Sequence, residues 1–241
     1  MDRRRCIDMV EKFHNELKSV KKEVIKMGYL SRDMLKNSVK ALKDRDLKLA
    51  NSVISQKIKL ADMDDKIEEN AFRLIALYQP MAKDMREIAC ILKLITYLTR
   101  IGRYGKDIAK IVKDFSSKDH VKKLIHIPQM SDIVCSMIDD GLIAFETGDI
   151  TKFNDFIERE SIVDEMRYSI YRECITYMIE DPKIITRCMN YTMVARYLER
   201  CADHACKMAE KIFYMVTGER VEIDCREETS KACFTRVRFQ K

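Results

Sequence analysis

Two pairs of carboxylates are the residues of this sequence best suited to chemistry. Glu160 and Asp164 lie four positions apart, and so do Glu199 and Asp203. On an α-helix, residues with this spacing project from one face, so each pair can act as a two-armed clamp. Four converging carboxylates repel one another unless cations neutralise them, and hard oxygen donors suit Fe, Mn, Mg or Ca better than soft-ligand metals. The spacing therefore makes these four residues a candidate metal site.

The alternative interpretation is that both pairs are ordinary helix charges. Acidic residues at this spacing are frequent on exposed helices, where a neighbouring arginine pairs with them. Three arginines of the sequence are available for such pairs, namely Arg159, Arg196 and Arg200. Spacing alone leaves both interpretations open.

Other patterns that would support catalysis are weak. A ferritin-like di-metal site needs the Glu-x-x-His pattern twice, and the sequence holds it once, at Glu11 and His14. The sequence has no G-x-x-x-x-G-K-[ST] phosphate loop, no nucleotide-binding glycine fingerprint and no G-x-S-x-G nucleophile motif. We expect no catalytic residues and no organic cofactor, and we keep a carboxylate-bridged di-metal oxidoreductase as the enzymatic alternative.

Long amphipathic helices must position the carboxylates. Of the 241 residues, 46% are hydrophobic, but only 6 are Gly and 3 are Pro, so the chain has few places to turn. Apolar residues recur at steps of three and four, as at Val20, Val24 and Met27. The pattern predicts an all-α fold of six long helices. We expect the breaks near residues 44–46, 79–80, 115–120, 148–149 and 181–182.

The sequence also repeats itself. Residues 97–104, YLTRIGRY, align without gaps with residues 197–204, YLERCADH. A period near 100 residues is too long for a solenoid repeat and suits two tandem three-helix bundles that arose by duplication. We predict a first three-helix repeat over residues 1–116, a second over 117–219, and a polar C-terminal tail over 220–241.

The repeated segment resembles a motif of the PhoU family. Members carry two copies of a helical segment that reads approximately Leu-Glu-Arg-Ile-Gly-Asp-His/Tyr-Ala, and residues 198–205, LERCADHA, match most of it. Residues 98–104 keep the Arg-Ile-Gly centre, and residues 79–86, QPMAKDMR, resemble the family's Gln-Pro-x-Ala-x-Asp-Leu-Arg stretch. The resemblance covers about residues 10–218.

The resemblance implies a non-enzymatic regulator that represses phosphate uptake by the phosphate-specific ABC transporter. The implied partners are the ATPase subunit of that transporter and a sensor histidine kinase, and we also expect a homodimer. Some family members bind metal clusters through E(D)xxxD motifs, so the resemblance implies Fe, Mn, Mg or Zn at Glu160, Asp164, Glu199 and Asp203. A metal-free helical adaptor is the other alternative.

The first copy departs from the acidic pattern. At the positions that correspond to the four carboxylates, it has Lys57, Ala61, Thr99 and Arg103. Lysine and arginine oppose cation binding, so we predict a single metal site, in the second repeat. His204, one residue after Asp203, points about 100° around the helix and is not expected to be a ligand. A solvated acidic turn is expected at Asp62, Asp64, Asp65 and Glu68.

Composition and charge indicate the environment. The nine cysteines form no C-x-x-C pair, and several occupy apolar helix positions, so we expect reduced, buried thiols. The net charge is +6, and the basic residues are interleaved with acidic ones rather than concentrated in a stripe as in a nucleic-acid-binding protein. The sequence has neither a signal-peptide pattern nor an uncharged apolar run of about eighteen residues. We expect a cytoplasmic protein without membrane insertion or nucleic-acid binding.

Overall fold

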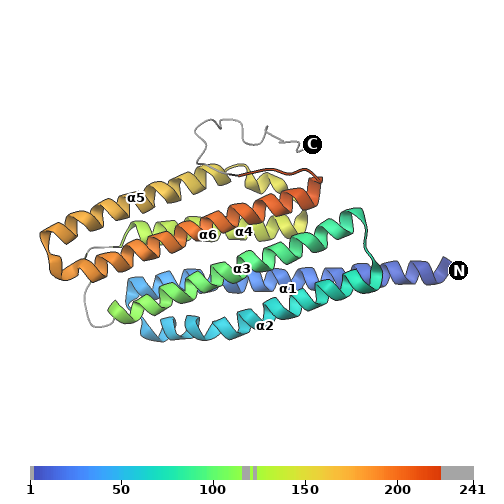
Figure 1. Ribbon diagram of the computed structural model, residues 1–241, viewed down its shortest axis with the longest axis horizontal. Coiled ribbons are helices and arrows are strands. Elements are labelled where there is room, and N and C mark those ends of the chain that lie inside the picture. Colours follow the sequence, from blue (N-terminus) through green and yellow to red (C-terminus); the bar gives the residue numbers. More distant parts are fainter. Residues whose placement is uncertain (1–2, 116–119, 122–123, 224–241) are drawn as a thin grey trace.

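The computed structural model describes residues 3–115, 120–121 and 124–223, and these residues form six long α-helices without a strand (Figure 1). The helices are α1 (Arg3–Asp44), α2 (Leu47–Tyr78), α3 (Ala82–Phe115), α4 (His126–Thr147), α5 (Phe156–Glu180) and α6 (Ile185–Thr217), with short 3-10 helices η1 (Ile150–Phe153) and η2 (Pro182–Ile184). The all-α prediction is confirmed. The predicted domain boundary at residues 116 and 117 lies outside the described residues, as does most of the predicted tail.

Local sequence signals explain where the helices end. The side chain of Asp46 accepts hydrogen bonds from the first backbone N–H groups of α2, which caps that helix. Gln79, in the left-handed conformation, ends α2 just before Pro80, and Gly148, with a φ of 79°, ends α4. Asp181 accepts from the N–H of Lys183 at the start of η2. These breaks fall where the sequence predicted them.

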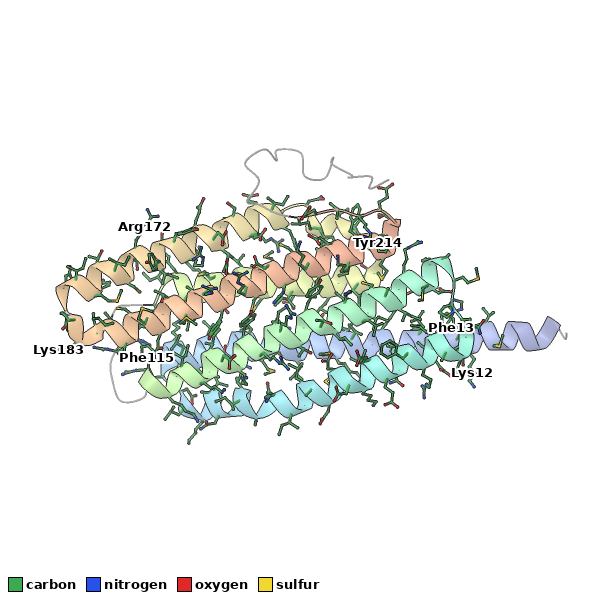
Figure 2. All side chains as sticks on the ribbon, in the orientation of Figure 1. Lys12, Phe13, Phe115, Arg172, Lys183 and Tyr214 are labelled. Carbon is green, nitrogen blue, oxygen red and sulfur yellow. The ribbon has the colours of Figure 1, made fainter. Side chains whose placement is uncertain are left out.

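The six helices form two three-helix bundles. Helices α1, α2 and α3 pack together, and so do α4, α5 and α6, while α3 packs against α6 and α1 against α4 to join the bundles side by side (Figure 1). Buried aliphatic and aromatic side chains fill the space between the helices along the whole length, from Phe13 at one end to Phe115 at the other (Figure 2). The duplication in the sequence therefore appears as two bundles of one design.

The bundles meet at the repeated segment itself. Tyr97 of α3 stacks on His204 of α6 with ring centroids 5.7 Å apart, and Tyr104 stacks on Tyr197 at 5.4 Å and on His204 at 6.0 Å. Because Tyr97 and Tyr104 correspond to Tyr197 and His204, the first two contacts are counterparts of each other. The repeats therefore pack as the two halves of a twofold-symmetric dimer do.

Gly105 allows α1 and α3 to approach closely. A Cβ atom at this position would lie 2.8 Å from the carbonyl carbon of Met34 and 2.9 Å from the backbone nitrogen of Leu35. Both are backbone atoms of α1, so a larger residue is accommodated only if the two helices move apart.

Gly105→Ala is expected to destabilise the protein by about 1 to 3 kcal/mol, because the added methyl group forces backbone shifts in a packed core. Urea unfolding followed by circular dichroism measures the change. Gly141→Ala is the control, since a Cβ there meets only the terminal methyl of Met208 at 3.6 Å. Alanine is the better helix former, so this control should be neutral or slightly stabilising. Equal stability of the two variants would contradict the close approach of α1 and α3.

Candidate functional site

The four predicted carboxylates lie on two adjacent antiparallel helices of the second bundle. Glu160 and Asp164 project from α5, and Glu199 and Asp203 project from α6. Glu160 and Glu199 are buried, with 6% and 8% of their surface exposed, whereas the two aspartates are half-buried. A carboxylate this deeply buried needs compensating polar or charged partners, so the surroundings of these groups decide what the site can do.

Three of the four carboxylates influence one another. Burial raises the pKa of Glu199, and the negative charges of Asp203 and Asp164 raise it further. Arg200 and Arg167 act in the opposite direction on this pKa. The α5–α6 pairing therefore brings Asp164 within electrostatic range of the pair on α6, as the helix spacing predicted.

Arginines supply the counter-charges at this place. Arg200 lies 3.1 Å from Asp203 (Nη1 to Oδ2) and 3.5 Å from Glu199 (Nε to Oε2), and the Nε of Arg167 lies 4.0 Å from Oδ1 of Asp164. From the sequence, Arg200 was named as a possible partner of these carboxylates but Arg167 was not. Arg167 follows Asp164 by three positions, a spacing that brings two side chains together on a helix and could have indicated the pair. Asp164, Glu199 and Asp203 are thus each paired with an arginine of the protein.

The other arginines named from the sequence do not join this cluster. Arg159 lies 2.7 Å from Asp140 of α4 and 2.7 Å from Asp155, so it ties α5 to α4 instead. Among the residues that the structure describes, no group of three or more His, Cys, Asp or Glu side chains is arranged to hold a metal ion. Metal binding by the predicted carboxylates therefore stays a prediction.

The first repeat has opposite charges at the equivalent place. Asp64 of α2, which aligns with Arg167, lies beside Thr99 and Arg103 of α3. Burial raises the pKa of Asp64, whereas the Thr99 hydroxyl and the positive charge of Arg103 lower it. In this repeat an acid from the second helix faces the third helix, and in the other repeat an arginine does. Each arrangement neutralises its half-buried charge with a partner of the opposite kind.

The acidic residues expected to be solvated in the first repeat are so with one exception. Asp62, Asp64, Asp65 and Glu68 lie in the middle of α2, which runs without interruption from Leu47 to Tyr78. Asp62, Asp65 and Glu68 are exposed, whereas Asp64 is half-buried against α3. The apolar positions Leu60 and Ile67 on either side keep the helical period and are buried.

His204 serves the contact between the bundles. Its ring stacks on Tyr97 and Tyr104 of α3, as expected for a residue that points away from Asp203. Burial lowers the pKa of His204 to about 4, Arg100 and Arg200 act in the same direction, and Asp203 opposes them. The imidazole is therefore neutral at pH 7.

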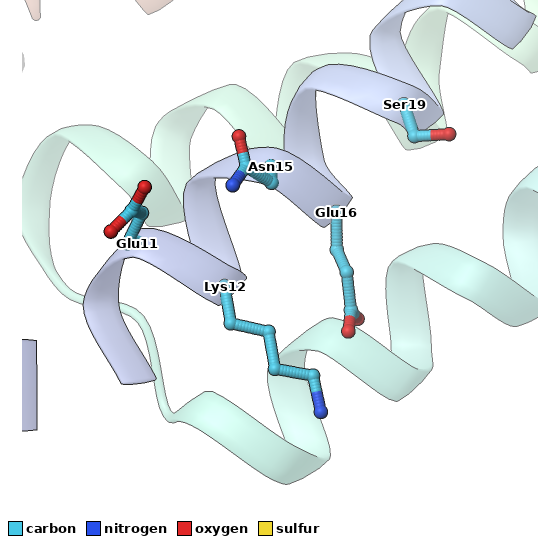
Figure 3. Close-up of a pocket in the computed structure, with 5 residues that line it drawn as sticks. All are labelled: Glu11, Lys12, Asn15, Glu16 and Ser19. Carbon is cyan, nitrogen blue, oxygen red and sulfur yellow. The ribbon is translucent and has the colours of Figure 1, made fainter. Parts of the chain in front are cut away.

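An open surface pocket on α1 is the other candidate site. It is lined by Glu11, Lys12, Asn15, Glu16 and Ser19 (Figure 3). Glu11 belongs to the lone Glu-x-x-His pattern, but His14 faces Asp84 of α3, with 3.6 Å between Nε2 and Oδ1. Glu16 accepts a hydrogen bond from the Tyr78 hydroxyl at 3.1 Å. A di-metal carboxylate site needs ligands from several facing helices, and this pocket is built from one.

A comparison with known protein families matches one segment in each of the two bundles. The family model described as the PhoU domain matches residues 24–112 and 127–212, which are one segment in each bundle. The chain belongs to the PhoU family. The family is one of accessory and regulatory proteins rather than enzymes, in agreement with the lack of catalytic motifs in the sequence. No helix within the described residues is long and apolar enough to cross a bilayer.

Relatives and solved structures match along most of their length. The chain is 36% identical to the phosphate-specific transport system accessory protein PhoU homolog of Rhizobium meliloti, over 86% of this chain and 87% of that one. It is also 36% identical to the homolog of Aquifex aeolicus, over 88% of this chain and 96% of that one. The crystal structure of PhoU from Pseudomonas aeruginosa superimposes with a TM-score of 0.82 at 31% identity, over 86% of this chain and 99% of that one. For the regulatory protein PhoU of Streptococcus pneumoniae the TM-score is 0.79 at 26% identity.

Replacement of His204 tests the packing of its neutral ring. The folded-state pKa of about 4 is below the ordinary value of 6.5, so the unfolded chain binds the proton more readily as the pH falls below 6.5. The stability from neutral His204 is thus complete above pH 6.5 and is lost as the pH falls towards 4. His204→Tyr installs the residue found at the equivalent Tyr104 and removes this loss.

Between pH 7 and pH 5, the unmodified protein should lose about 1 kcal/mol more stability than His204→Tyr, after allowance for partial solvent screening. Urea unfolding at both pH values measures the difference. The carboxylates titrate in both proteins, so their contribution to the pH dependence of stability cancels when the two proteins are compared. The same pH dependence in both proteins would show that His204 is not held neutral by its surroundings.

Proposed function

We propose that this protein is a non-enzymatic regulator of phosphate transport that acts through contacts with other proteins. The observation that carries the proposal is membership of the PhoU family over both repeats, together with relatives that are named accessory proteins of phosphate-specific transport. Long helices with exposed faces suit a protein that works by binding partners.

The proposed partners are the ATPase subunit of the phosphate-specific ABC transporter and a sensor histidine kinase, with a second copy of the chain in a homodimer. The proposed location is the cytoplasm, where an ATPase subunit of such a transporter meets a regulator. Both partners are proteins, in agreement with a net charge of +6 that is spread over interleaved acidic and basic residues.

Deletion of the gene tests the regulatory role. In the deletion strain, phosphate uptake and phosphate-responsive gene expression should be raised even when phosphate is abundant. Radiolabelled phosphate uptake and a reporter gene measure the two effects, and a plasmid copy of the gene should reverse both. Unchanged uptake and unchanged expression would refute the role in phosphate regulation.

We also propose that Glu160, Asp164, Glu199 and Asp203 bind Fe, Mn, Mg or Zn when Arg167 and Arg200 release their carboxylates. The electrostatic coupling of Glu199 to Asp203 and Asp164 supports this proposal, because a cation placed among them would relieve the repulsion. The arginines occupy the role that a metal would take, so arginine and metal compete for the same oxygens. The metal-free helical adaptor is the alternative.

Arg200→Gln is expected to strengthen Mn²⁺ binding about tenfold, because it removes a competing positive charge from Glu199 and Asp203. Isothermal titration calorimetry measures the affinity, and Glu199→Gln with Asp203→Asn should abolish it. Arg100→Gln is the matched control, since Arg100 occupies the equivalent position of the first repeat and is exposed. If neither the unmodified protein nor Arg200→Gln binds Mn²⁺, Fe²⁺, Mg²⁺ or Zn²⁺, the metal proposal fails and the adaptor alternative stands.

A further inference from the structure

The outward face of the α5–α6 hairpin carries large apolar side chains that the fold does not bury. On α5, Tyr168, Tyr171 and Ile179 are exposed, and Ile175 between them is half-buried. On α6, Ile185, Met189 and Met193 are exposed. The exposed fraction is 77% for Ile179 and 54% for Tyr168. We call these seven residues the apolar strip.

The apolar strip lies along the seam between the two helices. Its members on α5 follow the spacing i, i+3, i+7 and i+11 and share one side of that helix with Asp164, four positions before Tyr168. Asp164 is electrostatically coupled to Glu199 of α6, so this side of α5 is the one that borders α6. On α6, Ile185 shares one side of the helix with Asp203, and Met189 and Met193 follow at steps of four. The strip therefore runs along both sides of this seam, and we call the seam together with the strip the α5–α6 face.

The first repeat shows that the fold does not require this strip. The positions of α2 and α3 that correspond to Tyr168, Tyr171, Ile175, Met189 and Met193 hold Asp65, Glu68, Phe72, Ala89 and Lys93. Three of these five residues are charged. The first repeat keeps exposed apolar residues at Phe72, which corresponds to Ile175, and near the end of the hairpin at Leu77 and Met85. The same three-helix fold forms with charged residues at three of these positions, so the fold does not require the apolar strip. The strip therefore points to a contact made by the second bundle.

Positive charges border the apolar strip on both helices. Arg172 of α5 and Arg196 of α6 are exposed, and neither forms an ion pair with a carboxylate of the described residues. Figure 2 shows Arg172 on the outer edge of α5 and Lys183 at the turn between the helices. Arg167 lies over the Tyr168 ring at 4.3 Å and is already paired with Asp164. A partner that covers the strip gains two new ion pairs if it brings acidic groups to Arg172 and Arg196.

We propose that the α5–α6 face binds an amphipathic α-helix of a partner protein, with its apolar side on the strip and acidic side chains beside Arg172 and Arg196. The proposal rests on the proposed function, in which the protein acts by contact with other proteins. From Tyr168 to Ile179 the strip is about 16 Å long, which matches about three turns of a docked helix. Met189 and Met193 supply an adaptable surface.

Photo-crosslinking in living cells tests which molecule covers the α5–α6 face. A benzophenone amino acid replaces Met189 in the full-length protein, and mass spectrometry identifies the crosslinked peptide. The same crosslinker at Ala89, the equivalent exposed position of the first repeat, is the matched control. We expect position 189, but not position 89, to capture one helical segment whose polar face carries aspartate or glutamate.

A synthetic peptide of the captured segment then measures the energetics with the purified protein. Arg172→Glu with Arg196→Glu, and separately Tyr171→Ser, should each weaken binding about tenfold or more. Lys66→Glu with Lys93→Glu, which changes two exposed lysines of the first repeat, should leave binding unchanged. Replacement of the acidic residues of the peptide by lysine should restore binding to the Arg172→Glu, Arg196→Glu protein. All substituted residues are exposed, and circular dichroism verifies that each variant folds.

Several outcomes would overturn the proposal. Capture of a second copy of this chain would identify the α5–α6 face as a self-association surface, and capture of lipid alone would make it a membrane contact. Absence of any crosslinked partner, or peptide binding that is unchanged by Arg172→Glu with Arg196→Glu, would also refute the proposal. If gene deletion alters phosphate uptake but the double arginine variant does not, the docking proposal fails while the regulatory function stands. If deletion changes nothing, the regulatory function fails, and the crosslink still decides what the α5–α6 face binds.

Discussion

The packing of α3 against α6 decides how the rest of the molecule is arranged. Tyr97 and Tyr104 of one helix stack on His204 and Tyr197 of the other, so the two helices that carry the repeated motif form the centre of the structure. Helices α1 and α4 add a second contact between the bundles, while α2 and α5 pack mainly within their own bundle. This arrangement leaves the outer faces of α2 and α5 open to partners, and the face of α5 carries the exposed Tyr168, Tyr171 and Ile179.

The two repeats solve the same electrostatic problem with opposite charges. In the second repeat, Arg167 of α5 and Arg200 lie among carboxylates, and in the first repeat Asp64 of α2 lies beside Thr99 and Arg103. A half-buried charge is costly without a counter-charge, so a change of sign at one position has to be matched by a change at its partner. The scaffold tolerates the exchange because the pairs remain neutral. The first repeat lacks the cluster of acids that makes the second repeat a candidate for metal binding.

The second repeat thus holds both features that point to function. Two of the carboxylates that are candidates for metal binding, Asp164 and Asp203, lie on the same side of α5 and α6 as the apolar strip, and Arg167 contacts both Asp164 and the Tyr168 ring. A metal that displaced Arg167 from Asp164 would also disturb the position of this arginine over Tyr168. Binding of a cation and binding of a partner helix would then be coupled through one side chain, because each ligand favours a different position of the same guanidinium group.

Local pattern determined much of this protein from its sequence. Apolar periodicity and turn residues such as Asp46, Gln79 and Gly148 are signals within a few positions, so the helices and their ends were predictable, and the near-100-residue repeat indicated two bundles and the PhoU family. The carboxylates and their loss from the first repeat were also readable. The counter-charges of those carboxylates, the position of Asp64 against α3, the neutral state of His204 and the apolar strip beside two arginines depended on the tertiary structure. These features depend on which side chains of different helices face each other. The apolar periodicity of a single helix shows which of its sides is buried, but not how it is aligned along its neighbour.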